Sequence, residues 1–339
     1  MAIAVDAMGG DKAPREIIKG ALRAKRELGL ESILVGRQEE LEAELLNQGA
    51  AGELPVSHAS EVVEMDESPV KAARSKPDSS MARALRLVKE ERAEAMVSAG
   101  NSGAVMAAAV LILGRVKGIE RPALATVFPS LGDPTVVIDV GANVDSQPRH
   151  LLQFGIMGSI FAQYVLGYDN PRVGLLSVGE EDVKGNEQTR LAHDLLRNAA
   201  LNFVGNVEGR DLFVSKAQVV VCDGFVGNVC LKVTEGVAMA LYTLLKQEIM
   251  AGPVTKLGGL LLKPAFKRFD KRVNYAEYGG APLLGLNGSC LICHGASDHR
   301  AIRNAIQMAA EWVERRFNQQ LAEALSDYHE LEKKKAAGG

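Results

Sequence analysis

Short apolar runs rich in Val, Ile and Leu alternate along this chain with longer segments of helical period, and this alternation limits the fold more than any other feature. The runs are predicted to be strands, at positions 3–5, 32–35, 95–98, 123–128, 135–138, 173–178, 203–207, 219–222 and 289–293. Strands that are apolar on both sides are typical of a parallel sheet that helices cover on both faces. The sequence therefore predicts an α/β fold.

Helical segments fill most of the gaps between these strands. Pro14 suits a first helical position, and apolar residues follow it with helical spacing as far as Gly29. A length of 339 residues would allow two domains, but no linker rich in Pro, Ser or Gly divides the chain. We therefore expect residues 1–325 to form a single α/β/α unit of two interwoven lobes, followed by a frayed tail at 326–339.

The charge and the apolar content exclude several classes of protein. The chain has 39 Lys and Arg against 42 Asp and Glu, so it lacks the basic surplus of a nucleic-acid-binding protein. The longest unbroken apolar run, at 104–113, is about half of the roughly 20 residues that span a bilayer, and no transmembrane helix is predicted. The first residues also lack the basic start of a secretory signal. We expect a cytoplasmic protein that binds no nucleic acid.

The chain has four cysteines, and two of them lie in the sequence Cys-Leu-Ile-Cys-His at 290–294. This spacing matches c-type haem attachment, which requires export, and it also fits a redox dithiol. A redox motif usually opens a helix, whereas this one ends a predicted strand. Cys222 and Cys230 are not spaced as zinc ligands. We interpret all four as buried reduced thiols and predict no metal site, with a redox role of Cys290 and Cys293 left open.

Polar, glycine-rich turns follow four of the predicted strands, at 6–11, 98–103, 139–143 and 223–228. In open α/β sheets, ligands bind beyond the carboxyl ends of the strands. Glycine lets backbone N–H groups approach an anion, and a helix N-terminus favours negative charge. Asp and Asn are also ordinary turn and cap residues, so one such turn alone is more simply structural. Together the four turns predict a shared anion site.

The usual nucleotide signatures are absent, since neither G-x-x-x-x-G-K-[ST] nor a G-x-G-x-x-G after the first strand occurs. A further polar cluster at 179–187 places Lys184 among acids, either as a solvated loop charge or as a cation that faces an anionic substrate. A similar turn at 205–211 carries Glu208, an acid able to orient Lys184. His294 closes the last predicted strand, where both a structural and a catalytic role fit it.

Six motifs occur in order along the chain. They are Val-Asp-Ala-Met-Gly-Gly-Asp at 5–11, Ser-Ala-Gly-Asn-Ser-Gly-Ala at 98–104, Asp-Val-Gly-Ala-Asn-Val-Asp at 139–145, Asn-Val-Glu-Gly-Arg-Asp at 206–211, Cys-Asp-Gly-Phe-Val-Gly-Asn at 222–228 and Tyr-Gly-Gly-Ala-Pro-Leu-Leu-Gly at 278–285. As a set they resemble the bacterial phosphate acyltransferase family, PlsX, over nearly the whole chain, with a departure at Cys293. The resemblance implies a three-layer α/β/α fold with a large, mostly parallel mixed sheet, like that of isocitrate and isopropylmalate dehydrogenases.

The same resemblance implies an enzyme that transfers a fatty acyl group from acyl carrier protein to inorganic phosphate, giving acyl phosphate for phospholipid synthesis. Phosphate is itself the nucleophile, so neither a Ser or Cys nucleophile nor a cofactor is required. Lys184 and Asn228 are expected to stabilise charge on phosphate or on the thioester oxygen. Asp223 or Glu208 is expected to orient these two residues or to transfer a proton. Residues expected to bind phosphate or substrate are Asp6, Gly9, Gly10, Asp11, Ser98, Gly100, Asn101, Ser102, Gly103, Asn143, Glu180, Asn186 and His294.

A basic amphipathic segment at 251–283 breaks the α/β pattern. Its stretch 253–273 has a local charge of +5 in an acidic chain. It suits docking of the acidic acyl carrier protein or contact with an anionic membrane surface. The resemblance favours a homodimer in peripheral membrane contact, with the downstream membrane glycerol-phosphate acyltransferase as a further candidate partner. The contact residues are expected to be Lys256, Leu260, Leu261, Leu262, Lys263, Phe266, Lys267 and Arg268.

Two other functions compete with acyl transfer. A nicotinamide-dependent dehydrogenase of the isopropylmalate type shares the fold and needs arginines for substrate carboxylates and acids for a divalent metal. Arg115 and Arg121 with Asp139 and Asp145 give it thin support. A non-catalytic membrane scaffold would leave the four polar turns without a use.

Overall fold

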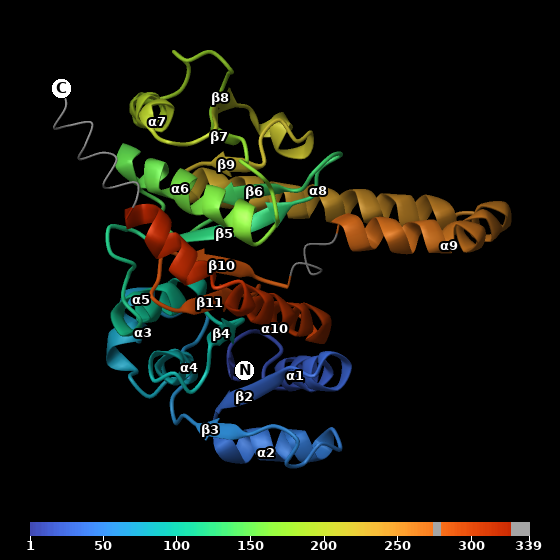
Figure 1. Ribbon diagram of the computed structural model, residues 1–339. Helices are drawn as coiled ribbons and strands as arrows, with labels where there is room; N and C mark the ends of the chain where they lie inside the picture. Colours follow the sequence, from blue (N-terminus) through green and yellow to red (C-terminus); the bar gives the residue numbers. More distant parts are fainter. Residues whose placement is uncertain (274–278, 327–339) are drawn as a thin grey trace.

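One eleven-stranded sheet runs through the molecule, and helices cover both of its faces (Figure 1). The computed structural model describes residues 1–273 and 279–326, without the side chains of 267 and 270–273, so nearly all of the predicted tail lies outside the described residues. The strands are β1 (Ala2–Asp6), β2 (Glu31–Gly36), β3 (Val56–His58), β4 (Ala95–Ser98), β5 (Ala123–Phe128), β6 (Thr135–Ile138), β7 (Val173–Leu176), β8 (Phe203–Val207), β9 (Val219–Val221), β10 (Ala281–Leu284) and β11 (Ser289–Ile292). The helices are α1 (Arg15–Leu28), α2 (Gln38–Asn47), α3 (Pro69–Ser75), α4 (Ser80–Lys89), α5 (Ser102–Ile112), α6 (Pro148–Tyr164), α7 (Glu187–Asn198), the short η1 (Gly209–Phe213), α8 (Gly224–Met250), α9 (Pro253–Val273) and α10 (His299–Glu314).

The sheet consists of two parallel blocks that run in opposite directions. Strands β3, β2, β1, β4 and β11 form one block, and β6, β9, β7 and β8 form the other. Between them, β10 pairs antiparallel with β11 and with β5, and β5 pairs antiparallel with β6. The strand direction therefore reverses at this junction, which separates two lobes. The four polar turns fall into two groups, one in each lobe, because β1 and β4 belong to one block and β6 and β9 belong to the other.

Alternate residues of the central strands pack on opposite faces of the sheet. In β1, Ile3 and Val5 belong to the core that also holds α1 and α10, whereas Ala4 belongs to the core on the α4 side. In β6, Ile138 and Val137 likewise face different cores. Burial on both faces explains the near-continuous apolar runs of the sequence. The predicted three-layer fold with a large, mostly parallel mixed sheet is confirmed.

All nine predicted strands are present, four of them with the predicted bounds. The sequence interpretation missed β3 and β10. The second of these is short, contains Pro282 and follows two glycines, so it lacks the usual pattern of a strand. Residues 281–283 of the predicted partner-facing segment consequently lie inside the sheet, where Leu283 is 1% exposed.

Helices α8 and α9 form a hairpin that projects from the sheet (Figure 1). By length and composition, α8 is the one helix among the described residues that is apolar enough to cross a membrane. This helix contains no long unbroken apolar run, because Lys232 and Glu235 interrupt its apolar residues. Its first turn belongs to the core of the fold, since Gly224 and Gly227 are buried there.

The start of α8 leaves no room for a side chain at Gly227, where a Cβ would lie 1.9 Å from the backbone oxygen of Asp139. Gly227→Ala is therefore expected to lower the free energy of unfolding by about 3 kcal/mol, because backbone must move. The matched control is Gly236→Ala in the same helix, where the space is open; it is expected to raise the free energy by about 0.5–1 kcal/mol. Urea unfolding followed by circular dichroism measures both. Equal effects of the two substitutions would contradict the close packing.

Candidate active site

The polar turns of the first lobe meet at a buried carboxyl group. Asp6 is 1% exposed, and the Ser98 hydroxyl donates a hydrogen bond of 2.6 Å to its Oδ2. Ser98 Oγ in turn accepts a hydrogen bond of 3.0 Å from the Gly100 N–H. Burial raises the pKa of Asp6, although Ser98 and other donors act in the opposite direction. The ends of β1 and β4 are thereby joined through side chains.

The glycines of these turns allow the turns to pack against each other. A Cβ on Gly9 would lie 2.6 Å from Asp6 Oδ2 and 2.8 Å from the Gly100 nitrogen. The Asp11 N–H donates a hydrogen bond of 2.9 Å to the Gly295 carbonyl, so the residues after β11 belong to the same cluster. Glycine is thus required here for the packing of three strand ends. The role of Gly9, Gly10, Gly100 and Gly103 in holding phosphate stays a prediction.

The polar turn after β6 is organised by Asp139. Its buried carboxylate accepts hydrogen bonds from the N–H groups of Leu124 at 2.9 Å and Asn143 at 2.6 Å, among others. The Asn143 side-chain amide donates to Asp139 at 2.9 Å and to the Pro122 carbonyl at 2.8 Å. Burial nevertheless raises the pKa of Asp139. The backbone carbonyl oxygen of Asn143 also accepts a hydrogen bond from the Gly224 N–H. The Asp139 turn therefore positions the start of α8.

A cavity of about 310 Å³ lies at the junction of the two lobes. The residues around it include Ser102, Thr126, Gly141, Asn228, Lys232 and His294. Three of these, Ser102, Asn228 and His294, were predicted as site residues, and they come from α5, from α8 and from the turn after β11. We call this space the junction cavity.

Lys232 and Glu235 also line the junction cavity and pair with each other at 2.9 Å. The sequence interpretation did not include either as a site residue. They follow Asn228 at spacings of four and then three residues, which is one face of a helix. This helical spacing is the feature of the sequence that could have identified Lys232 and Glu235 as site residues.

Several predicted site residues serve the fold. The Asn101 side chain accepts the Ala104 N–H at 3.1 Å, which caps α5, and donates to the Met65 carbonyl at 3.0 Å. Asp223 Oδ1 accepts from the second and third N–H groups of α8 at 2.9 Å. The Nδ1 atom of His294 accepts the Ala296 N–H at 3.1 Å. These bonds agree with the cap roles that the sequence left open.

The polar cluster around Lys184 does not line the junction cavity. Glu180 pairs with Lys216 at 2.8 Å, and Glu208 pairs with Arg210 at 3.0 Å rather than orienting Lys184. Asn186 caps α7 by accepting the Thr189 N–H at 2.8 Å. The ammonium of Lys184 is exposed and forms no hydrogen bond or ion pair within the described part of the chain.

The cysteines are all free, and only Cys230 is not buried. Burial raises the pKa of Cys290 and of Cys293 to about 12, so both are protonated at neutral pH. Cys290 donates a hydrogen bond to the Met96 sulfur at 3.6 Å. Within residues 1–273 and 279–326, no three His, Cys, Asp or Glu side chains are grouped to hold a metal ion.

Solved structures define the class of the fold. The chain is similar to a phosphotransacetylase from Streptococcus pyogenes, with a TM-score of 0.65 at 18% identity over 92% of this chain and 94% of that one. A 4-hydroxythreonine-4-phosphate dehydrogenase from Klebsiella pneumoniae has a TM-score of 0.53 at 15% identity, over 92% of this chain and 99% of that one. The expected dehydrogenase-like α/β/α fold, shared with phosphotransacetylases, is confirmed.

Sequence comparison identifies the family. The model of the fatty acid synthesis protein family matches residues 1–320, and the chain belongs to this family. The chain is 53% identical to a phosphate acyltransferase of Pelotomaculum thermopropionicum, over 100% of this chain and 98% of the relative. It is 54% identical to a phosphate acyltransferase of Desulfitobacterium hafniense, over 96% of this chain and 98% of the relative. The resemblance drawn from the six motifs is confirmed.

Proposed function

We propose that this chain transfers a fatty acyl group from acyl carrier protein to inorganic phosphate and so makes acyl phosphate for phospholipid synthesis. Its relatives named phosphate acyltransferase match it almost end to end. The observation in the structure that best supports the proposal is the position of the junction cavity beside an apolar groove. A fatty acyl thioester likewise has a polar reacting end and a long apolar chain.

The apolar groove has a volume of about 570 Å³ and runs between β5 and α8. Phe128, Leu231, Met239 and Tyr242 are among its lining residues. It shares Thr126, Leu231, Lys232, Glu235 and His294 with the junction cavity. Each buried CH₂ group contributes about 0.8 kcal/mol, so a long acyl chain in this groove would hold the thioester carbonyl at the polar end.

In the proposed reaction, a phosphate oxygen attacks the thioester carbonyl carbon. The new C–O bond forms as the C–S bond breaks, and the carrier protein leaves as a thiol after it takes up the proton that hydrogen phosphate loses. Asn228 and Ser102 line the cavity with groups that donate hydrogen bonds to a developing oxyanion. Lys184 does not line this cavity, but its exposed ammonium is not committed to another described residue, and we propose that it neutralises the charge of phosphate as the anion approaches.

The reaction is tested by phosphorus NMR of enzyme, long-chain acyl carrier protein and phosphate, with hydroxylamine to trap acyl phosphate. Asn228→Ala is expected to lower turnover about 100-fold, as loss of an oxyanion donor does in other enzymes.

Lys184→Ala is expected to remove most turnover, whereas Lys89→Ala, at an exposed lysine of α4, leaves turnover unchanged. No enzyme-dependent acyl phosphate from the wild type would refute the proposal, and near-normal turnover would remove Lys184 from the mechanism.

We also propose that the protein is cytoplasmic and that helix α9 of the α8–α9 hairpin contacts anionic membrane. Leu260, Leu261 and Leu262 are 64%, 75% and 53% exposed on α9. Lys256, Lys263 and Arg268 are exposed on the same helix, and Phe266 is half-buried. The side chain of Lys267 lies outside the described residues. Exposed leucines beside cations are typical of a helix that rests on an anionic surface, to which acyl carrier protein and the downstream acyltransferase would come.

Changing the three leucines at 260–262 to Glu is expected to abolish sedimentation with vesicles that contain anionic lipid, because it removes apolar contact and adds negative charge. Leu191→Glu, at an exposed leucine of α7, is the control and should sediment as the wild type does. Sedimentation of the triple variant at the wild-type level would refute membrane contact by α9.

The exposed apolar stripe of α8 supports a homodimer. Val233, Val237, Leu241 and Leu244 are each more than half exposed and recur every three or four residues. Such a stripe is the pattern of a helix that packs along a partner helix, and we propose that a second copy of this chain covers it. Val237→Glu with Leu241→Glu is expected to give a monomer by light scattering, while Leu46→Glu on α2 leaves a dimer. A monomeric wild type would contradict this proposal.

A further inference from the structure

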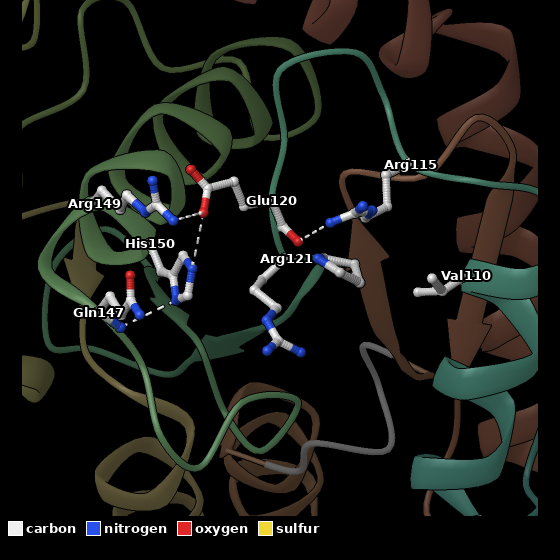
Figure 2. A pocket seen from close by; sticks show the side chains of 8 residues that line it. Val110, Arg115, Glu120, Arg121, Gln147, Arg149 and His150 are labelled. Carbon is white, nitrogen blue, oxygen red and sulfur yellow. Dashed lines mark hydrogen bonds and ion pairs between the residues drawn. The ribbon is translucent and has the colours of Figure 1, made fainter. Parts of the chain in front are cut away.

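A second cavity, of about 330 Å³, lies between α5, the segment before β5 and the start of α6 (Figure 2). It shares no lining residue with the junction cavity. Its charged lining residues are Arg115, Glu120, Arg121 and Arg149, and His150 also lines it. We call it the arginine cavity.

The single carboxylate of the arginine cavity is already engaged. Glu120 Oε2 lies 2.8 Å from the Arg149 guanidinium and 3.3 Å from His150 Nε2. Arg115 donates to the backbone carbonyl of Glu120. Arg121 has no hydrogen-bond or ion-pair partner in the described part of the chain, and Figure 2 shows its guanidinium extending away from Glu120.

His150 adds no positive charge at neutral pH. Its side chain is buried, and burial lowers its pKa more than the Glu120 carboxylate raises it. The Gln147 N–H donates to His150 Nδ1 at 3.0 Å, so this nitrogen is an acceptor and the hydrogen on Nε2 faces Glu120. The lining therefore has three guanidinium groups and one carboxylate, which gives a net charge of about +2 around the cavity.

We propose that Arg115, Arg121 and Arg149 form a binding site for a phosphate group, carried by inorganic phosphate or by a phosphate ester. The guanidinium fork matches the oxygens of phosphate and makes paired, charge-assisted hydrogen bonds to them. A phosphate dianion balances the net charge and presents several acceptors in one compact group. The inference does not require acyl transfer, because it rests on the geometry and charge of the arginine cavity alone.

The site also has a structural link to the junction cavity. Pro122, beside Arg121, lines the arginine cavity, and its carbonyl accepts the Asn143 amide at 2.8 Å. Asn143 belongs to the Asp139 turn, whose Gly141 lines the junction cavity. The two cavities therefore lie on either side of one hydrogen-bonded turn.

Calorimetric titration of the full chain with inorganic phosphate, without an acyl donor, tests the site. Arg121→Gln is expected to weaken binding at this site at least tenfold, since it removes the uncommitted guanidinium. Lys117→Gln removes the same charge from the same segment but lies outside the cavity, and it should bind as the wild type does. Proton NMR of the His150 ring, assigned with His150→Gln, locates the event, because this ring lines the cavity.

A shift of the His150 signal in the wild type that disappears in Arg121→Gln would support the site. An unresponsive His150 signal, or wild-type affinity in a natively folded Arg121→Gln variant, would overturn it. Ethyl phosphate and malate complete the test. Binding of phosphate alone identifies free phosphate as the ligand, binding of ethyl phosphate identifies an ester, and tighter binding of malate than of either would overturn the phosphate assignment. Failure of acyl transfer in the NMR assay would leave all these results unchanged.

Discussion

The hydrogen bonds of the buried Asp139 carboxylate hold the middle of this molecule together. The Asp139 carboxylate accepts hydrogen bonds from N–H groups at the start of β5 and in its own turn. Asn143 extends the network to Pro122 and to the start of α8. A buried carboxylate with several donors is costly to disturb, so the turn is a rigid reference point. It places Asn228 at the junction cavity and Arg121 at the arginine cavity. Both candidate sites therefore depend on one network.

The reversal of strand direction between the blocks has a functional consequence. Polar turns of a doubly wound sheet usually collect at one edge, but here β10 and β5 separate two sets of turns. The junction cavity forms where helix α5 of one lobe and helix α8 of the other approach β5. An apolar groove continues from it along α8. This arrangement suits a substrate that is polar at one end and a hydrocarbon at the other.

The positions of the residues that a dehydrogenase would use weaken this alternative function. Its proposed acid Asp139 has both carboxylate oxygens occupied by N–H donors, so it is not available to bind a cation. Its proposed arginines, Arg115 and Arg121, do line one cavity, but that cavity is separate from the junction cavity. The family and the named relatives agree with acyl transfer instead.

The sequence by itself determined the α/β class, nine strands and the family, because buried strands and their polar turns are local patterns. It did not reveal β10, whose Pro282 hides a strand that only its two neighbours stabilise, and so it missed the reversal of the sheet. The partners of Glu208 and the grouping of Arg115 and Arg149 were equally hidden. Contacts between residues far apart in the chain have no periodic signature, and tertiary packing alone decides them.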